Sequence, residues 1–130
     1  MHTSIELADD YLLGAPVPKP AVIAALLAER SAAPAAAPFY RALEAIGVRA
    51  ADEAIIALRL VLAGKSASDA SVRRLRDLAR VARAAAAGDR SGVAAAMAAN
   101  PALPEGLSSA ADLTDTRAAV KAAYLRELDA

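Results

Sequence analysis

The chain has 130 residues, no net charge and a pI near 6.6, so it fits one ordinary domain with no overall field for nucleic acid or acidic lipid. Hydrophobic residues make up 57% and charged residues 23%, which is a globular and not a disordered composition. There is no cysteine, and the one histidine, His2, lies beside the first residue. We therefore expect no catalytic residue, no metal site and no cofactor.

The composition also predicts where the protein resides. The longest apolar runs are about eight residues, far short of the ~20 residues of a membrane span, so no membrane partner is expected. The segment MHTSIELADD has neither a basic region nor an apolar core, so no secretory signal is expected. We predict a cytoplasmic protein. Arginine outnumbers lysine 12 to 3, a bias typical of GC-rich coding, which indicates a bacterial source.

Helical signals dominate along the chain, and no segment has the alternating pattern of a strand. Thr3 and Glu6 form a capping box that opens a helix reaching about Leu13. Further helices are expected over residues 20–30, 38–46, 50–63, 69–87 and 91–100, and from 109 or 112 nearly to the C-terminus. The pattern predicts an all-α fold, a compact bundle of six or seven short helices.

Glycine and proline residues separate the predicted helices. Gly47, Gly64 and Gly88 follow three of the predicted helices, where a left-handed C-terminal cap is most easily formed by glycine. The intervals of 17 and 24 residues have no fixed period, so we predict no repeat array. The segment SAAPAAAP, residues 31–38, is interpreted as a flexible linker within one helical domain of residues 1–130.

The predicted helix at 50–63 is apolar around most of its circumference. A helix of this kind is either central in one bundle or turns one side to another subunit, and both readings stay open. Ile56 and Leu60 are the candidate partner contacts in the second case. Asp52 and Arg59 form the narrow polar stripe, and a buried pair of these two is the best candidate for a ligand-binding or enzymatic polar site.

The strongest charge feature is VRRLRDLARVAR, residues 72–83. Its arginines at 73, 76, 80 and 83 fall within about 80° on a helical wheel. Residues 65–90 carry seven basic and three acidic side chains, a net charge of +4. The stripe formed by Arg73, Arg76, Arg80 and Arg83 is open to three interpretations: a solvated surface, a site for an acidic protein or second subunit, or a nucleic-acid site. No aromatic residue accompanies it for base stacking.

The hairpin AAAAGDRSGVAAAMAAN, residues 84–100, has a pattern of small and apolar residues around a Gly-Asp corner. Its distinctive positions are Ala84, Ala85, Gly88, Asp89, Val93, Met97 and Asn100. These positions resemble one helix pair of an ankyrin repeat. The resemblance covers one hairpin, and no second copy follows 33 residues away, so no ankyrin stack is predicted. It favours a binding scaffold over an enzyme.

Together these features favour a non-catalytic protein-protein interaction module, such as an accessory subunit, adaptor or small regulator. We expect it to self-associate or to bind a larger partner. A helical DNA- or RNA-binding regulator that uses the arginine stripe is the alternative. A small-ligand protein or enzyme built on Asp52 and Arg59 ranks third.

Overall fold

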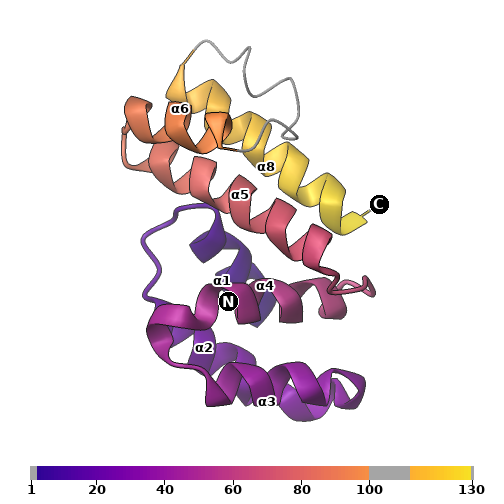
Figure 1. Ribbon diagram of the computed structural model, residues 1–130. Coiled ribbons are helices and arrows are strands. Elements are labelled where there is room, and N and C mark those ends of the chain that lie inside the picture. Colours follow the sequence, from indigo (N-terminus) through magenta and orange to yellow (C-terminus); the bar gives the residue numbers. More distant parts are fainter. Residues whose placement is uncertain (1–2, 100–111, 130) are drawn as a thin grey trace.

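The computed structural model describes residues 3–99 and 112–129 of the chain. Within these ranges it contains seven α-helices and no strand (Figure 1), which confirms the predicted all-α bundle. The helices are α1 (Ser4–Leu12), α2 (Lys19–Ala28), α3 (Ala37–Ala45), α4 (Ala51–Leu62), α5 (Asp69–Ala86), α6 (Arg90–Ala98) and α8 (Leu113–Asp129). Two residues singled out in the sequence, His2 and Asn100, lie outside the described ranges.

Side chains just before three helices explain where those helices begin. The Thr3 hydroxyl accepts a hydrogen bond from the Glu6 amide at 3.1 Å, as the capping-box pattern predicted. Ser68 caps α5 and Asp89 caps α6 in the same way. These caps satisfy amide groups that have no partner within a helix, and they fix the helix starts to within a residue or two of the predicted positions.

The predicted left-handed glycine caps are confirmed at two positions and wrong at one. Gly64 and Gly88, which follow α4 and α5, have φ values of +78° and +72°. Gly47 has φ −68° and is the N-cap of a short 3-10 helix, Val48–Ala50, so it does not form a left-handed C-terminal cap on α3. The cause is that α3 ends at Ala45 and the next residue, Ile46, is extended.

A further left-handed glycine brings two helices close together. Gly14, directly after α1, has φ +93°, and a Cβ atom there would lie 2.8 Å from the Cβ of Ala86 on α5. Only glycine relieves both the backbone strain and this contact. The α1–α2 connection can therefore pack directly against α5.

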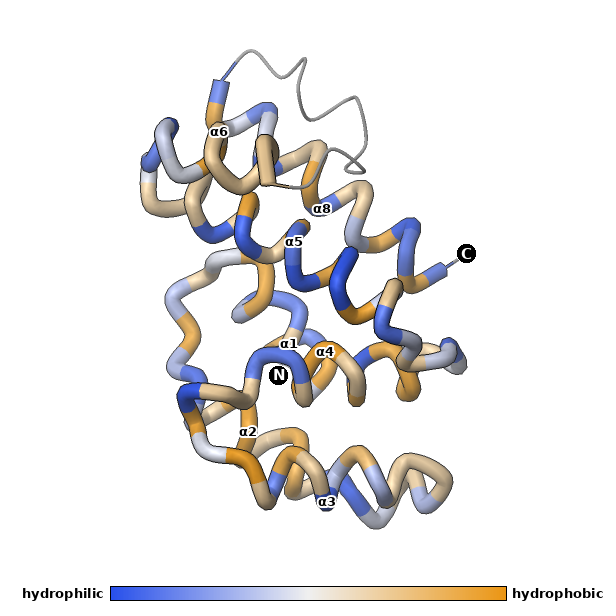
Figure 2. The backbone as a smooth tube through the Cα atoms, in the orientation of Figure 1, coloured by the Kyte–Doolittle hydropathy of each residue, from blue (hydrophilic) through white to orange (hydrophobic). Residues whose placement is uncertain are grey.

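Helix α5 lies between two groups of helices. It contacts α6 and α8 on one side and α1 and α4 on the other, while α2 and α3 lie beyond α1 and α4 (Figure 1). Hydrophobic and hydrophilic residues alternate along α5 in Figure 2, as expected for a helix with packed and charged faces. Tyr124 of α8 is the largest fully buried side chain in the core.

The segment predicted as a linker, residues 31–38, has local structure of its own. It contains most of the 3-10 helix Arg30–Ala32, all of the 3-10 helix Pro34–Ala36, and the start of α3. Ala36 is buried, and the second 3-10 helix contacts α4. The segment therefore packs on the rest of the protein through small side chains, those of Ala33 and Ala36.

Helix α4 lies at the centre of the bundle, as in the first of the two interpretations of its apolar circumference. Ile55, Ile56, Leu58 and Leu60 are each no more than 1% exposed. The candidate partner contact at Leu60 is therefore wrong, because this side chain is enclosed by the protein's own core. Ile56 is equally buried, yet it forms part of the floor of a cleft.

Among the described residues, no helix combines the length and the apolar character needed to cross a bilayer.

Candidate functional site

A cleft of about 410 Å³ opens between the N-terminal part of α4 and the middle of α5, and we call it the α4–α5 cleft. Its charged lining consists of Arg49, Asp52, Glu53, Arg76, Arg80 and Arg83. Its apolar lining consists of Leu12, Ile46, Ala50, Ile56 and Ala79. The volume lies in the usual range of about 300–1,000 Å³ for binding pockets.

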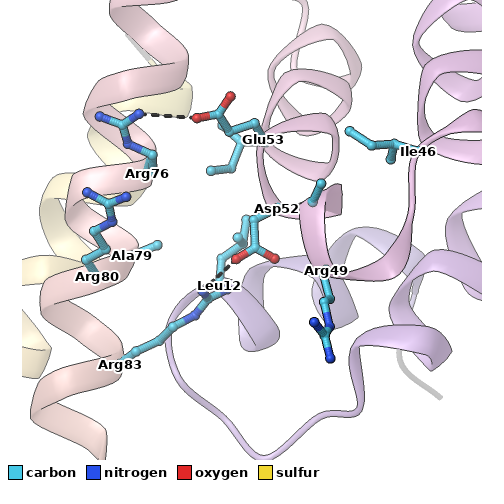
Figure 3. A pocket seen from close by; sticks show the side chains of 11 residues that line it. Leu12, Ile46, Arg49, Asp52, Glu53, Arg76, Ala79, Arg80 and Arg83 are labelled. Atoms are coloured by element: carbon cyan, nitrogen blue, oxygen red, sulfur yellow. Dashed lines mark hydrogen bonds and ion pairs between the residues drawn. The ribbon is translucent and has the colours of Figure 1, made fainter.

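Helical spacing explains why the arginines gather at this cleft. Residues 76, 80 and 83 are four and three positions apart, so they share one face of α5. Figure 3 shows Arg76 and Arg83 reaching from α5 toward Glu53 and Asp52 on α4, with Arg80 between them. Arg73 is exposed and does not line the cleft, because it lies three residues nearer the start of α5. The predicted stripe therefore places three of its four members at the cleft.

The arginines of the cleft differ in how firmly they are paired. Arg76 donates to Glu53 at 3.2 Å and lies 3.5 Å from Asp77. Arg80 lies 3.7 Å from Asp77, and 60% of its side chain is exposed. Arg49 forms no ion pair with any described residue. Among the described residues, the guanidinium groups of Arg49 and Arg80 therefore form no ion pair and one long ion pair, respectively.

Asp52 is the centre of a partly exposed network that borders the cleft, which we call the open cluster. Its carboxylate accepts hydrogen bonds from Tyr11 and Arg83, both at 2.9 Å, and pairs with Lys19 at 2.9 Å. The Arg83 guanidinium also lies 4.6 Å from the centroid of the Tyr11 ring, a cation–π distance. Asp52 therefore joins α1, the start of α2, α4 and α5.

The same contacts set the protonation state of the open cluster. Burial acts to raise the pKa of Asp52, but hydrogen bonds from Lys19, Arg83 and Tyr11 outweigh it, so this pKa is lowered from 3.8. Burial and the hydrogen bond to Asp52 raise the pKa of Tyr11 above 10.0. Asp52 is accordingly ionised and Tyr11 neutral at neutral pH.

The cleft keeps a positive charge despite these pairs. Its lining has four arginines and two acids, and Lys19 and Asp77 pair with lining residues, which gives five positive and three negative groups. The net charge is +2. Combined with an apolar floor, this arrangement suits a ligand that has both carboxylates and apolar groups.

A second network, which we call the closed cluster, lies deeper in the fold. Arg59 of α4 donates two hydrogen bonds to Asp9 of α1, at 2.8 and 3.2 Å. Tyr124 of α8 donates to the same carboxylate at 2.5 Å. Burial and the negative charge of Asp9 raise the pKa of Tyr124 far above its usual range. Hydrogen bonding to Asp9 overcomes the effect of burial and raises the pKa of Arg59.

The predicted pair of Asp52 and Arg59 is therefore not formed. The two residues lie about two turns apart on α4, and each pairs with a residue from another helix. Arg59 contributes to the closed cluster and does not line the cleft. Asp52 does border the cleft, so one half of the predicted polar site is found there.

The sequence reasoning missed three contributors to the open cluster and cleft, namely Tyr11, Lys19 and Arg49. Arg49 follows Ile46 and Val48 in the IGVR segment, and the available sequence signal was a basic residue beside apolar residues between two predicted helices. The structure shows that both apolar side chains are exposed. Nothing local in the sequence indicated that Tyr11 meets Asp52, 41 residues away. Within the described residues, no three His, Asp or Glu side chains are grouped as metal ligands.

Comparison with protein-family models, with curated proteins and with solved structures gives no match for this chain. The resemblance of residues 84–100 to an ankyrin helix pair therefore has no family model or solved structure in support of it.

Proposed function

We propose that the protein is a non-catalytic binding module for another protein, and that the α4–α5 cleft is its docking site. The observation that supports this proposal is a net positive cleft with exposed apolar side chains at its rim and directly beside it. Ionic groups around an apolar centre are the usual composition of protein interfaces. Both carboxylates of the cleft lining, Asp52 and Glu53, are held by ion pairs with arginines, which is a binding arrangement and not one for general acid–base catalysis.

Two exposed apolar residues lie at or next to the cleft. Among the described residues, the exposed large hydrophobic side chains are Ile46, Val48 and Leu125. Ile46 lines the cleft, and Val48 follows it in the α3–α4 connection. Large apolar side chains that stay exposed next to a cleft favour a protein contact over open solvent.

The geometry favours a protein over a nucleic acid as the partner. Phosphate binding requires cationic groups that project freely along a surface. Here Arg76 and Arg83 are paired with Glu53 and Asp52 at the cleft wall. Only Arg73 of the stripe stands on open surface without an ion pair to a described residue.

The proposal is tested by affinity capture from a lysate of the source organism, with Ile46→Asp and Leu125→Asp as matched variants. Both side chains are about equally exposed, at 39% and 40%, but only Ile46 borders the cleft. We expect Ile46→Asp to reduce recovery of the specific partner about tenfold or more, as for a central interface residue. Leu125→Asp should leave recovery unchanged.

Sedimentation of the purified chain shows whether that partner is a second copy. A dimer that Ile46→Asp dissociates, and Leu125→Asp does not, agrees with the proposal. Equal capture of the partner by both variants would show that the docking site lies outside the cleft. A monomer that captures nothing above an unrelated helical protein would overturn the proposal.

A further inference from the structure

We propose that the occupant of the α4–α5 cleft is an acidic amphipathic segment of the partner protein. One large apolar side chain of this segment packs at the cleft rim beside Ile46 and Val48, and its flanking carboxylates pair with Arg49 and Arg80. This inference rests on the proposed function, because it specifies the partner chemistry at the same site.

The charge argument starts from which cations are free to bind. Arg83 is held by Asp52 and stacked over Tyr11, and Arg76 is held by Glu53 and Asp77. Among the described residues, Arg80 forms one long ion pair, with Asp77 at 3.7 Å, and 60% of its side chain is exposed. A carboxylate that approaches Arg80 gains a strong bidentate partner without first breaking a short ion pair.

Arg49 provides the second free cation from another part of the chain. It lies in the 3-10 helix Val48–Ala50, whereas Arg80 lies on α5. Figure 3 places Arg49 and Arg80 on different sides of the cleft, with Asp52 between them. Because Asp52 is already neutralised by Lys19 and Arg83, it opposes an incoming anion only weakly. An occupant with carboxylates at two places therefore fits better than one with a single charge.

The apolar surface argues for a peptide and against a small anion. Leu12, Ile56 and Ala79 line the bottom of the cleft but are at most 3% exposed, so the accessible apolar surface lies mainly at its rim, where Ile46 is 39% exposed. Val48, half exposed, extends the apolar surface along the α3–α4 connection. A small dicarboxylate leaves this surface uncovered, whereas an amphipathic segment covers it while its carboxylates reach the arginines.

The test is selection from a phage-displayed library of random peptides against the purified full-length protein. Selected peptides are expected to carry Glu or Asp on both sides of a Leu, Ile, Phe or Met. Their affinity should fall about tenfold in Arg80→Glu and in Arg49→Glu, since a like charge replaces an attractive one. Replacing with lysine only the peptide acid that faces the mutated position should restore binding to the corresponding Glu variant.

Arg73→Glu is the matched control, because it makes the same charge change on the same helix outside the cleft. The mutated arginines are exposed, so circular dichroism and thermal unfolding should show intact folding for all three variants. Selection of basic or uncharged peptides, or an equal loss in Arg73→Glu, would overturn the inference. The Ile46→Asp capture experiment would still decide the proposed function by itself.

Two other probes complete the test. Citrate and inorganic phosphate should compete with the peptides only through ionic strength, matched by sodium chloride. Specific, Arg80-dependent binding of either ion would assign the cleft to a small anion and overturn the inference. Arg80-dependent binding of mixed-sequence single-stranded DNA or RNA, tighter than that of the peptides, would do the same.

Discussion

The open and closed clusters contain the same three residue types and share helices α1 and α4, but they differ in burial. Each joins an aspartate, an arginine and a tyrosine, and each uses one residue from α1 and one from α4. In the closed cluster the Arg59 and Asp9 side chains are 12% and 19% exposed, and Tyr124 is fully buried. In the open cluster Asp52 and Arg83 are each 33% exposed.

This difference separates a structural role from a binding role. In the closed cluster the Asp9 carboxylate accepts bonds from α4 and α8, so it fastens the C-terminal helix to the N-terminal half of the protein. In the open cluster Arg83 retains one buried terminal nitrogen without a hydrogen-bond acceptor among the described residues. Water weakens exposed ion pairs, so the open cluster is expected to contribute less stability while staying accessible at a cleft.

The largest difference in stability between the clusters is expected when their arginines, Arg59 and Arg83, are replaced. Arg59→Met leaves the mostly buried Asp9 carboxylate without its cation, and we expect it to lower the free energy of unfolding by about 3 kcal/mol. Arg83→Met should cost about 1 kcal/mol, because Asp52 keeps Lys19 and contact with solvent. Urea denaturation at neutral pH measures both values.

A double variant controls for the cause of that loss. Asp9→Leu combined with Arg59→Met removes both charges, so it should recover part of the stability lost in Arg59→Met alone. Equal losses for Arg59→Met and Arg83→Met would mean that burial does not distinguish the two clusters.

The second contrast compares the two tyrosine hydroxyls. Tyr124→Phe removes a buried hydrogen bond to a carboxylate and should cost about 2 kcal/mol, whereas Tyr11→Phe should cost under about 1 kcal/mol. The pKa of Tyr124 is raised above its unfolded value of 10.0. Its stabilising contribution is therefore complete below pH 10.0 and is lost as pH rises toward the folded pKa.

Tyrosinate absorbance resolves the order in which Tyr11 and Tyr124 ionise, because the chain has three tyrosines and no tryptophan. In a Tyr40→Phe background, Tyr11 should ionise first, and Tyr124 should ionise only together with the loss of helical circular dichroism. Ionisation of Tyr124 before unfolding would contradict the closed cluster.

The helices were predictable because their signals are local. Thr3, Ser68 and Gly88 act on amides or carbonyls within a few residues, so the sequence alone located these helix ends. The clusters were not predictable in this way. Tyr124 and Asp9 are 115 residues apart, and their contact depends on how α8 and α1 each pack against α5.

One local signal for the closed cluster was nevertheless present. Asp9 lies in the last turn of α1, where a negative charge opposes the helix dipole and no basic residue lies nearby on that helix. An acid in this position indicates a cation from elsewhere. The sequence could not identify that cation as Arg59, because Asp52 on the same helix was an equally plausible partner for it.

The smallest and most discriminating contrast uses the two aspartates. Asp52→Asn should lower stability by about 1 kcal/mol at neutral pH. Because the folded pKa of Asp52 lies below 3.8, this contribution is present above that value and is lost as pH falls through the folded pKa. The stability difference between wild type and Asp52→Asn should therefore vanish in strong acid, as measured by urea denaturation across that range.

The same substitution sharpens the distinction between stability and binding. Asp52→Asn removes one negative group from the cleft, so binding of the acidic peptides should become a few-fold tighter even as stability falls. Asp9→Asn should reduce stability further and leave peptide affinity unchanged, because Asp9 does not line the cleft. If both variants changed affinity alike, the open cluster would be as structural as the closed one, and the charge of the cleft would not govern what it binds.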